Sequence, residues 1–125
     1  MEAVHLFDLA SRKTKWLSVR QSAIAENIAN VDTPRYRARD VQPFSDVMDK
    51  TRLTMTATQA GHLDSAGQPK ADALKPSDSW KTTVSGNTVS TEQELMKAGD
   101  VSRDFALTTS IVKSFHRMIL QSIKG

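Results

Sequence analysis

The C-terminal part of the sequence carries an apolar stripe that limits the fold more than any other feature. Between residues 90 and 125, large side chains recur at alternating steps of three and four, the spacing of one face of a helix. The members of this stripe are Val101, Phe105, Thr108, Val112, Phe115, Ile119 and Ile123. Because the same spacing is typical of a coiled coil, it predicts a long helix that packs lengthwise on another helix.

The expected start of this helix is Thr91, which is followed by Glu92 and Glu94. A threonine N-cap and a glutamate three residues later satisfy each other's free backbone amides, and acidic residues favour the positive end of the helix dipole. Gly99 is the weak point of the predicted helix, and a bend is expected there.

Residues 2–30 carry a second stripe with the same spacing. Its apolar members are Ala3, Phe7, Ala10, Leu17, Ile24 and Ile28. No proline or glycine interrupts this segment before Pro34, so a second long helix is expected. We therefore predict a mainly α fold, in which two long antiparallel terminal helices form a coiled-coil hairpin. Residues 1–30 and 90–125 together would form one helical rod-core domain. The predicted helix-packing interface comprises Phe7, Ala10, Leu17, Ile24 and Ile28 with Val101, Phe105, Val112, Phe115, Ile119 and Ile123.

Residues 31–89 form a segment of a different kind. They include all four prolines and three of the five glycines of the chain, together with many Ser, Thr and Asp residues. Such a composition predicts loops and short strands. Residues 53–58 alternate apolar and hydroxylated side chains, which favours a strand, and residues 80–84 are its candidate partner in a small β-hairpin. Residues 65–78 have the composition of a loop.

A second apolar row lies beside the C-terminal stripe. It contains Leu107, Ile111 and Met118, and one partner helix cannot cover both rows. Either the middle segment folds over the second row or neighbouring subunits cover it. We favour neighbouring subunits, because residues 31–89 contain few large apolar side chains. Trp16 is a further candidate for contact between subunits, since a tryptophan in an amphipathic helix more often serves packing or an interface than ligand binding.

The residues needed for several kinds of chemistry are missing or badly spaced. The chain has no cysteine, which removes disulfides, thiolate metal sites and cysteine nucleophiles. His5, His62 and His116 are far apart in the sequence. There is no glycine-flanked nucleophilic serine and no glycine loop of the kind that binds phosphate. We therefore expect no catalytic residue, cofactor or metal, and no enzymatic activity.

The charged residues do not favour a nucleic acid as the partner. The formal charge of +3 comes from 17 basic and 14 acidic residues that are interspersed along the chain. A small DNA-binding protein that uses Arg35, Arg37 and Arg39 stays only as a weak alternative. No stretch approaches the apolar length that spans a membrane. The first residues lack the regions of a cleaved secretion signal, so no signal cleavage is expected.

The most informative string, residues 27–41, follows the first predicted helix. Asn30 is suited to the left-handed conformation that closes a helix, and Pro34 prevents the helix from continuing. Tyr36 has an aromatic ring with a polar tip, which suits it to dock the outgoing chain on the helix end. The string resembles the Ala-Asn-x-x-Thr-Pro-Gly-Tyr signature of the flagellar basal-body rod, hook and hook-associated family. The matching residues are Ala29, Asn30, Thr33, Pro34 and Tyr36.

Further residues are most similar to the proximal-rod members of this family. They are residues 37–41 with Phe44, residues 86–89, residues 115–117 and residues 123–125. Arg35 stands where the family usually has glycine, so the turn either keeps a positive φ despite the side chain or takes another shape. Ser85 replaces an acidic residue that often precedes Gly86, which leaves that turn with a weaker side-chain cap.

The resemblance implies a structural subunit of the proximal rod of the bacterial flagellar basal body. Its terminal helices would assemble into a tubular rod that crosses the periplasm and links the export apparatus and MS ring to the distal rod. The subunit would leave the cell body through the flagellar type III apparatus without signal cleavage. The implied partners are other copies of the chain, FliE, FlgC and related rod subunits, and the export apparatus. The alternative is a soluble helical adaptor that binds a single protein partner.

Overall fold

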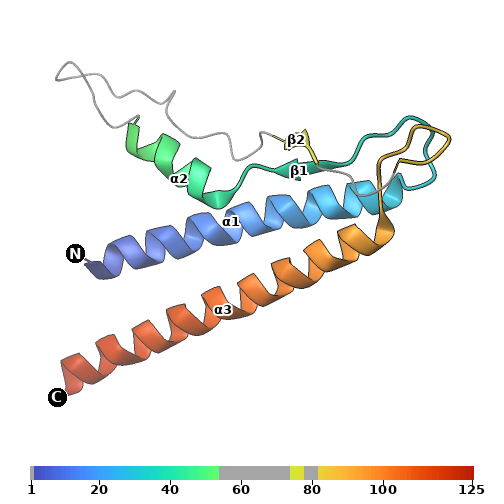
Figure 1. The fold of residues 1–125 in the computed structure, drawn as a ribbon. Helices are drawn as coiled ribbons and strands as arrows, with labels where there is room; N and C mark the ends of the chain where they lie inside the picture. Colours follow the sequence, from blue (N-terminus) through green and yellow to red (C-terminus); the bar gives the residue numbers. More distant parts are fainter. Residues whose placement is uncertain (1, 54–73, 78–81) are drawn as a thin grey trace.

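The two long helices expected from the sequence are present. The computed structural model describes residues 2–53, 74–77 and 82–125. Helix α1 spans Glu2–Ala29 and helix α3 spans Thr91–Lys124. They lie side by side and run in opposite directions, so that both termini are at the same end of the molecule (Figure 1). The prediction of a mainly helical protein is therefore confirmed. In the described part of the chain, no helix is long and apolar enough to cross a membrane.

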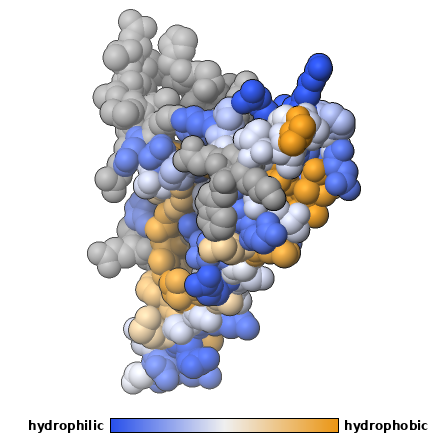
Figure 2. All heavy atoms as spheres, turned by 45° about the vertical axis from the view of Figure 1, so that its right-hand side comes forward, coloured by the Kyte–Doolittle hydropathy of each residue, from blue (hydrophilic) through white to orange (hydrophobic). Residues whose placement is uncertain are grey.

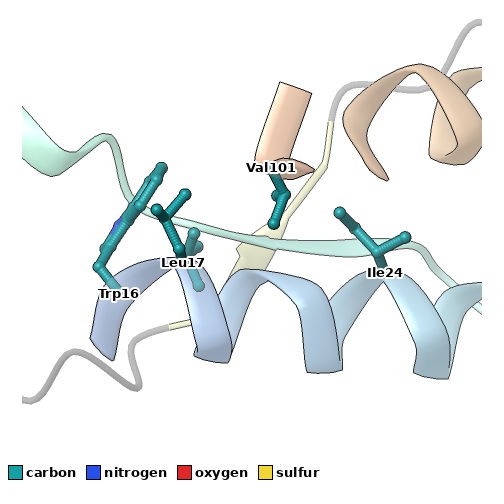
Figure 3. Packing of buried hydrophobic residues seen from close by; sticks show 5 residues of the cluster. Trp16, Leu17, Ile24 and Val101 are labelled. Atoms are coloured by element: carbon teal, nitrogen blue, oxygen red, sulfur yellow. The ribbon is translucent and has the colours of Figure 1, made fainter. Parts of the chain in front are cut away.

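A small apolar core joins α1, α3 and the segment that follows α1. Trp16, Leu17 and Ile24 of α1 are buried together with Val41 and with Val101 of α3 (Figure 3). The half-buried side chains packed around them are those of Val19, Ile28, Phe44, Val47, Ala98 and Phe105. Full burial of one large apolar side chain contributes about 1.5–3 kcal/mol, so this core is small for two helices of such length. It holds the helices together near their connected ends.

A pair of short strands lies beside α1, but it is not the hairpin that the sequence predicted. Strand β1, Arg39–Val41, pairs antiparallel with strand β2, Leu74–Pro76. The pairing sets Arg39 opposite Pro76 and Val41 opposite Leu74. Strands of three residues are too short to show the alternation from which strands are recognised, and a proline at the end of an edge strand removes no hydrogen bond that the pair needs. The expectation of a loop throughout residues 65–78 is therefore wrong at β2.

The strand predicted at residues 53–58 is also wrong where the structure describes it. Leu53 is the last residue of helix α2, which spans Phe44–Leu53, whereas residues 54–58 lie outside the described residues. Residues 82–84 of the predicted partner strand have no strand structure, and residues 80 and 81 are not described.

Helix α2 was not expected, because residues 31–89 as a whole have the composition of loops and short strands. Phe44 and Val47 are one helical turn apart on the same face of α2, and both pack against the core. The ring of Phe44 lies 5.8 Å from that of Trp16. The middle segment therefore covers part of α1, and tertiary contact stabilises a helix that its own sequence pattern only weakly indicates.

The N-cap of helix α3 lies one residue before the predicted cap, so the helix itself begins at Thr91. Ser90 is the N-cap, and its side chain makes no capping hydrogen bond but donates to the Glu92 carboxylate at 3.0 Å. The reciprocal cap predicted for Thr91 and Glu94 is therefore wrong, because the Glu94 carboxylate points into the protein, where it is fully buried. The chain remains helical through Gly99, beside which there is open space.

Candidate functional site

The turn that ends α1 closes by a different residue from the one predicted. Among the described non-glycine residues, only Arg35 has a positive φ, 62°, so the left-handed conformation predicted for Asn30 is wrong. The Asn30 side chain instead donates from Nδ2 to the Glu26 carbonyl at 2.8 Å and accepts from the Thr33 hydroxyl at 3.1 Å. The turn keeps a positive φ where the family has glycine, although this conformation costs a residue with a side chain about 1–2 kcal/mol.

Asn87, which comes from the segment before α3, holds this turn in place. Its Nδ2 atom lies 2.9, 2.9 and 2.7 Å from the carbonyl oxygens of Asn30, Val31 and Thr33. Its Oδ1 atom accepts from the Val89 amide at 2.7 Å. Only 1% of Asn87 is exposed, so these contacts satisfy carbonyl groups that the end of a helix leaves free. This role of Asn87 was not predicted from the sequence, although residues 86–89 contribute to the family resemblance.

Asn27, in the last turn of α1, likewise binds backbone groups of another segment through its side-chain amide. It is fully buried and binds both backbone polar groups of Arg39, with Nδ2 donating to the carbonyl at 2.7 Å and Oδ1 accepting from the amide at 3.0 Å. Its Nδ2 also donates to Glu94 at 3.2 Å, and Oδ1 accepts from the Tyr36 hydroxyl at 3.4 Å. One amide therefore fixes α1, the outgoing chain and α3 together. The apolar-stripe pattern gave no signal for it.

A charged network extends from this point. Lys97 Nζ lies 3.2 Å from Glu94 Oε1 and 3.5 Å from Asp40 Oδ2, and it donates to the Ser77 hydroxyl at 2.7 Å. Asp40 also pairs with Arg20, whose Nε is 3.2 Å from Oδ1. Within the described residues, no buried side-chain nitrogen or oxygen lacks a hydrogen-bond partner. The buried polar groups thus form hydrogen bonds and ion pairs with one another, and these contacts fix the positions of α1, β1 and α3 relative to each other.

Tyr36 lies at the edge of the same cluster. Its backbone carbonyl accepts from the Thr88 amide at 3.0 Å, so the ring and backbone join the two loops at this end of the molecule. Burial is the main cause that raises the pKa of Tyr36 above its usual 10.0, and the negative charge of Glu26 adds to it. Ala29 and Pro34, the other residues of the family signature, are exposed.

The predicted helix-packing residues differ in burial along the helices. Leu17, Ile24 and Val101 are buried in the core. Near the free ends the rings of Phe7 and Phe115 meet edge to face, with centroids 5.9 Å apart. The half-buried members of the predicted interface are Ala10, Ile28, Phe105, Val112, Phe115 and Ile119. Ile123 is exposed in the last turn of α3.

Trp16 has a different position from the one expected of an inter-subunit contact. Only 6% of it is exposed, its ring packs on Phe44, and its indole Nε1 donates to the Gln42 carbonyl at 2.8 Å. Lys13 Nζ lies 4.5 Å from the centre of the ring. Because the chain itself covers this side chain, the structure contradicts the expectation that Trp16 faces a neighbour.

The second apolar row of α3 is uncovered. Leu107, Ile111 and Met118 are 60%, 45% and 57% exposed. None of residues 102–125, all of which the structure describes, is buried. Apolar side chains form a band along the helical part of the molecule (Figure 2). A hollow of about 510 Å³ adjoins the row at Leu107; its lining residues are Arg20, Asp100, Arg103, Asp104 and Leu107.

The described polar cluster and the exposed apolar row suit contact with another protein rather than catalysis or metal binding. The buried polar groups bind one another, and in the described part of the chain no three His, Asp or Glu side chains converge as a metal site would require. A long helix leaves large apolar side chains in contact with water, which is typical of a surface that another protein covers. The fold and its surface therefore define a class of structural proteins that act through contacts between subunits.

Comparison with known proteins identifies the family. A family model described as flagella basal body rod protein matches residues 16–37. The flagellar basal body rod protein FlgB of Agrobacterium fabrum is 40% identical over 129 residues, which cover 99% of this chain and 96% of that protein. FlgB of Escherichia coli is 35% identical over 101 residues, with 73% and 72% covered, and FlgB of Salmonella typhimurium is 28% identical over 116 residues, with 85% and 83% covered.

The chain belongs to the FlgB family of flagellar basal body rod proteins. It is accordingly a structural component of the flagellar basal body and not an enzyme. The resemblance inferred from the turn after α1 is confirmed.

Proposed function

We propose that this chain is a subunit of the proximal rod and that it assembles through its terminal helices into the tube linking the export apparatus and MS ring to the distal rod. The observation that carries this proposal is the exposure of Leu107, Ile111 and Met118 on a helix half without a buried residue. Full burial of such a side chain contributes about 1.5–3 kcal/mol, so covering each half-exposed member of the row contributes roughly half of that. Heterologous contacts that do not close a ring produce a helical polymer.

The terminal helices are proposed to form a coiled-coil hairpin and, with it, the rod-core domain of residues 1–30 and 90–125. The edge-to-face contact of Phe7 and Phe115 supports this, because it joins the two helices on the half nearer to their free ends. Residues 31–89 would form the outward segment, apart from Val41, which is buried in the core, and α2, whose Phe44 packs against the core.

The partners are proposed on the basis of family membership. They are further copies of this chain, FliE, FlgC and related rod subunits, and the flagellar type III export apparatus, which would carry the chain to the periplasmic rod without signal cleavage. A soluble adaptor with one partner is less favoured, because such a protein has no need of a second uncovered row on α3.

Substitutions in the uncovered row test the proposal. Ile111→Glu and Met118→Glu place charges where a neighbouring subunit would pack, and the matched control Ser110→Glu adds the same charge at an exposed polar residue beside them. We expect the first two variants to be secreted and to keep the helical circular dichroism of the wild-type chain, but to abolish motility. The control should remain motile. Unfolding of the isolated Ile111→Glu and Met118→Glu chains, with the control folded, would instead indicate that the row is covered within one molecule.

A further inference from the structure

Three arginines lie within five residues of one another in the segment that follows α1. Arg35, Arg37 and Arg39 are all exposed, and none forms an ion pair with a described acidic side chain. Half of the other cations with described side chains do form ion pairs, namely Arg12, Lys13, Arg20, Lys97 and Arg103. Asp32 in the same turn is exposed and reduces the local charge only in part. This group, Arg35 with Arg37 and Arg39, is called the arginine tip below.

The backbone holds the arginine tip in a defined position. Arg35 has a φ of 62°, and its amide donates to the Ser85 carbonyl at 3.0 Å. Gly86 lies against it with a φ of 80°, and a Cβ atom there would be 3.8 Å from the Arg35 Cα. The two turns thus support each other. A glycine at residue 35 would take this conformation without strain, so the protein keeps an arginine at a backbone cost.

The arginine tip is separate from the apolar row of α3. The loop after α1, which carries Arg35 and Arg37, lies at the connected end of the molecule, and β1, which begins at Arg39, follows it alongside α1, whereas the termini and the last turns of α3 lie at the other end (Figure 1). Val84, in the turn next to Arg35, is fully exposed and adds an apolar side chain to the same end. A partner of this surface would therefore contact the subunit independently of the row at Leu107.

We propose that the arginine tip docks on a carboxylate-bearing surface of a neighbouring protein. A guanidinium binds a carboxylate through two parallel hydrogen bonds, and arginine is enriched at protein interfaces. Three cations are fewer than the four to eight that typically bind an anionic membrane. A duplex nucleic acid would require a longer basic strip than this tip offers. The fixed backbone and the adjacent Val84 both suit a specific protein contact.

A binding assay on the full, monomeric chain tests this inference. The probe is a labelled polyglutamate peptide, with polyglutamine as the uncharged control, at low salt. The variant Arg35→Gln/Arg37→Gln removes two charges from the tip. The matched variant Lys113→Gln/Arg117→Gln removes two charges from exposed positions on α3. If each of the two exposed pairs contributes about 0.2–1 kcal/mol, the tip variant should bind the peptide about twofold to thirtyfold more weakly, and the α3 variant should bind almost as the wild type does.

Arg35→Gly separates the charge from the fold. This variant should bind the peptide more weakly without losing thermal stability, because glycine fits the backbone conformation of residue 35. Equal losses in the tip and α3 variants, undetectable peptide binding, or unchanged binding by Arg35→Gly would overturn the proposal. So would tighter binding to duplex DNA or to phosphatidylcholine and phosphatidylglycerol vesicles. None of these variants changes Leu107, Ile111 or Met118, so a negative result would not contradict the proposed rod assembly.

Discussion

Substitution of Asn87 is the sharpest test of how the two loops hold the helices together. Its amide satisfies the carbonyl groups of Asn30, Val31 and Thr33 and the amide of Val89 in a site from which water is almost excluded. Each such hydrogen bond contributes about 1 kcal/mol net. Asn87→Ala should therefore lower the free energy of unfolding by about 2–4 kcal/mol, a large part of the roughly 5–15 kcal/mol typical of a small domain.

The isosteric Asn87→Asp is the more decisive variant. A carboxylate has the shape of the amide but no hydrogen to donate, so it would face three carbonyl oxygens with the same sign of charge. We expect a loss of about 3–5 kcal/mol, larger than that of Asn87→Ala. Urea titration followed by circular dichroism measures the losses, with Gln21→Glu, the same amide-to-carboxylate change at an exposed residue of α1, as a control expected to cost less than about 1 kcal/mol. If Asn87→Asp unfolds at the wild-type urea concentration, the contacts of this amide do not stabilise the fold.

Three further results follow from the core and its polar edge. Leu17→Ala should cost about 2–5 kcal/mol in urea titration, because Leu17 is fully buried, whereas Leu107→Ala should cost less than about 1 kcal/mol; equal costs would contradict the described core. Glu94→Gln should cost about 1–3 kcal/mol, and a double-mutant cycle with Lys97→Met should show coupling; additive losses would refute the ion pair. Because the pKa of Tyr36 is raised in the folded state, its contribution is complete below pH 10.0 and is lost as the pH rises through the folded-state pKa. The stability difference between the wild type and Tyr36→Phe should therefore shrink in alkaline urea titrations, and a constant difference would argue against this linkage.

The helices could be predicted because their information is local and periodic. Leu17, Ile24 and Val101 repeat at helical spacing and are buried in the structure. The turn after α1 could also be located from local information, because Pro34 prevents a helix from continuing. The residue with the positive φ could not be chosen correctly, because Arg35 is held in that conformation by Ser85, which is distant in the sequence.

The buried polar contacts could not be predicted from sequence patterns, because they join residues that are distant in the sequence. Glu94 has the sequence context of an exposed residue in the first turn of a helix, and only the approach of Asn27 and Lys97 makes its burial favourable. Asn87 satisfies carbonyls more than fifty positions earlier in the chain. Such contacts depend on the finished fold, and one isolated sequence carries no periodic trace of them.

The uneven burial of the two helices has a mechanical consequence. The buried residues lie between Trp16 and Val101 in the chain, on the half nearer to the loops, while the opposite half is joined by contacts such as that of Phe7 with Phe115. A helix pair clamped at one end can change its splay while its register stays constant, because the few contacts at the open end resist opening weakly. In the proposed rod, one sequence could thereby fit slightly different neighbours in successive layers.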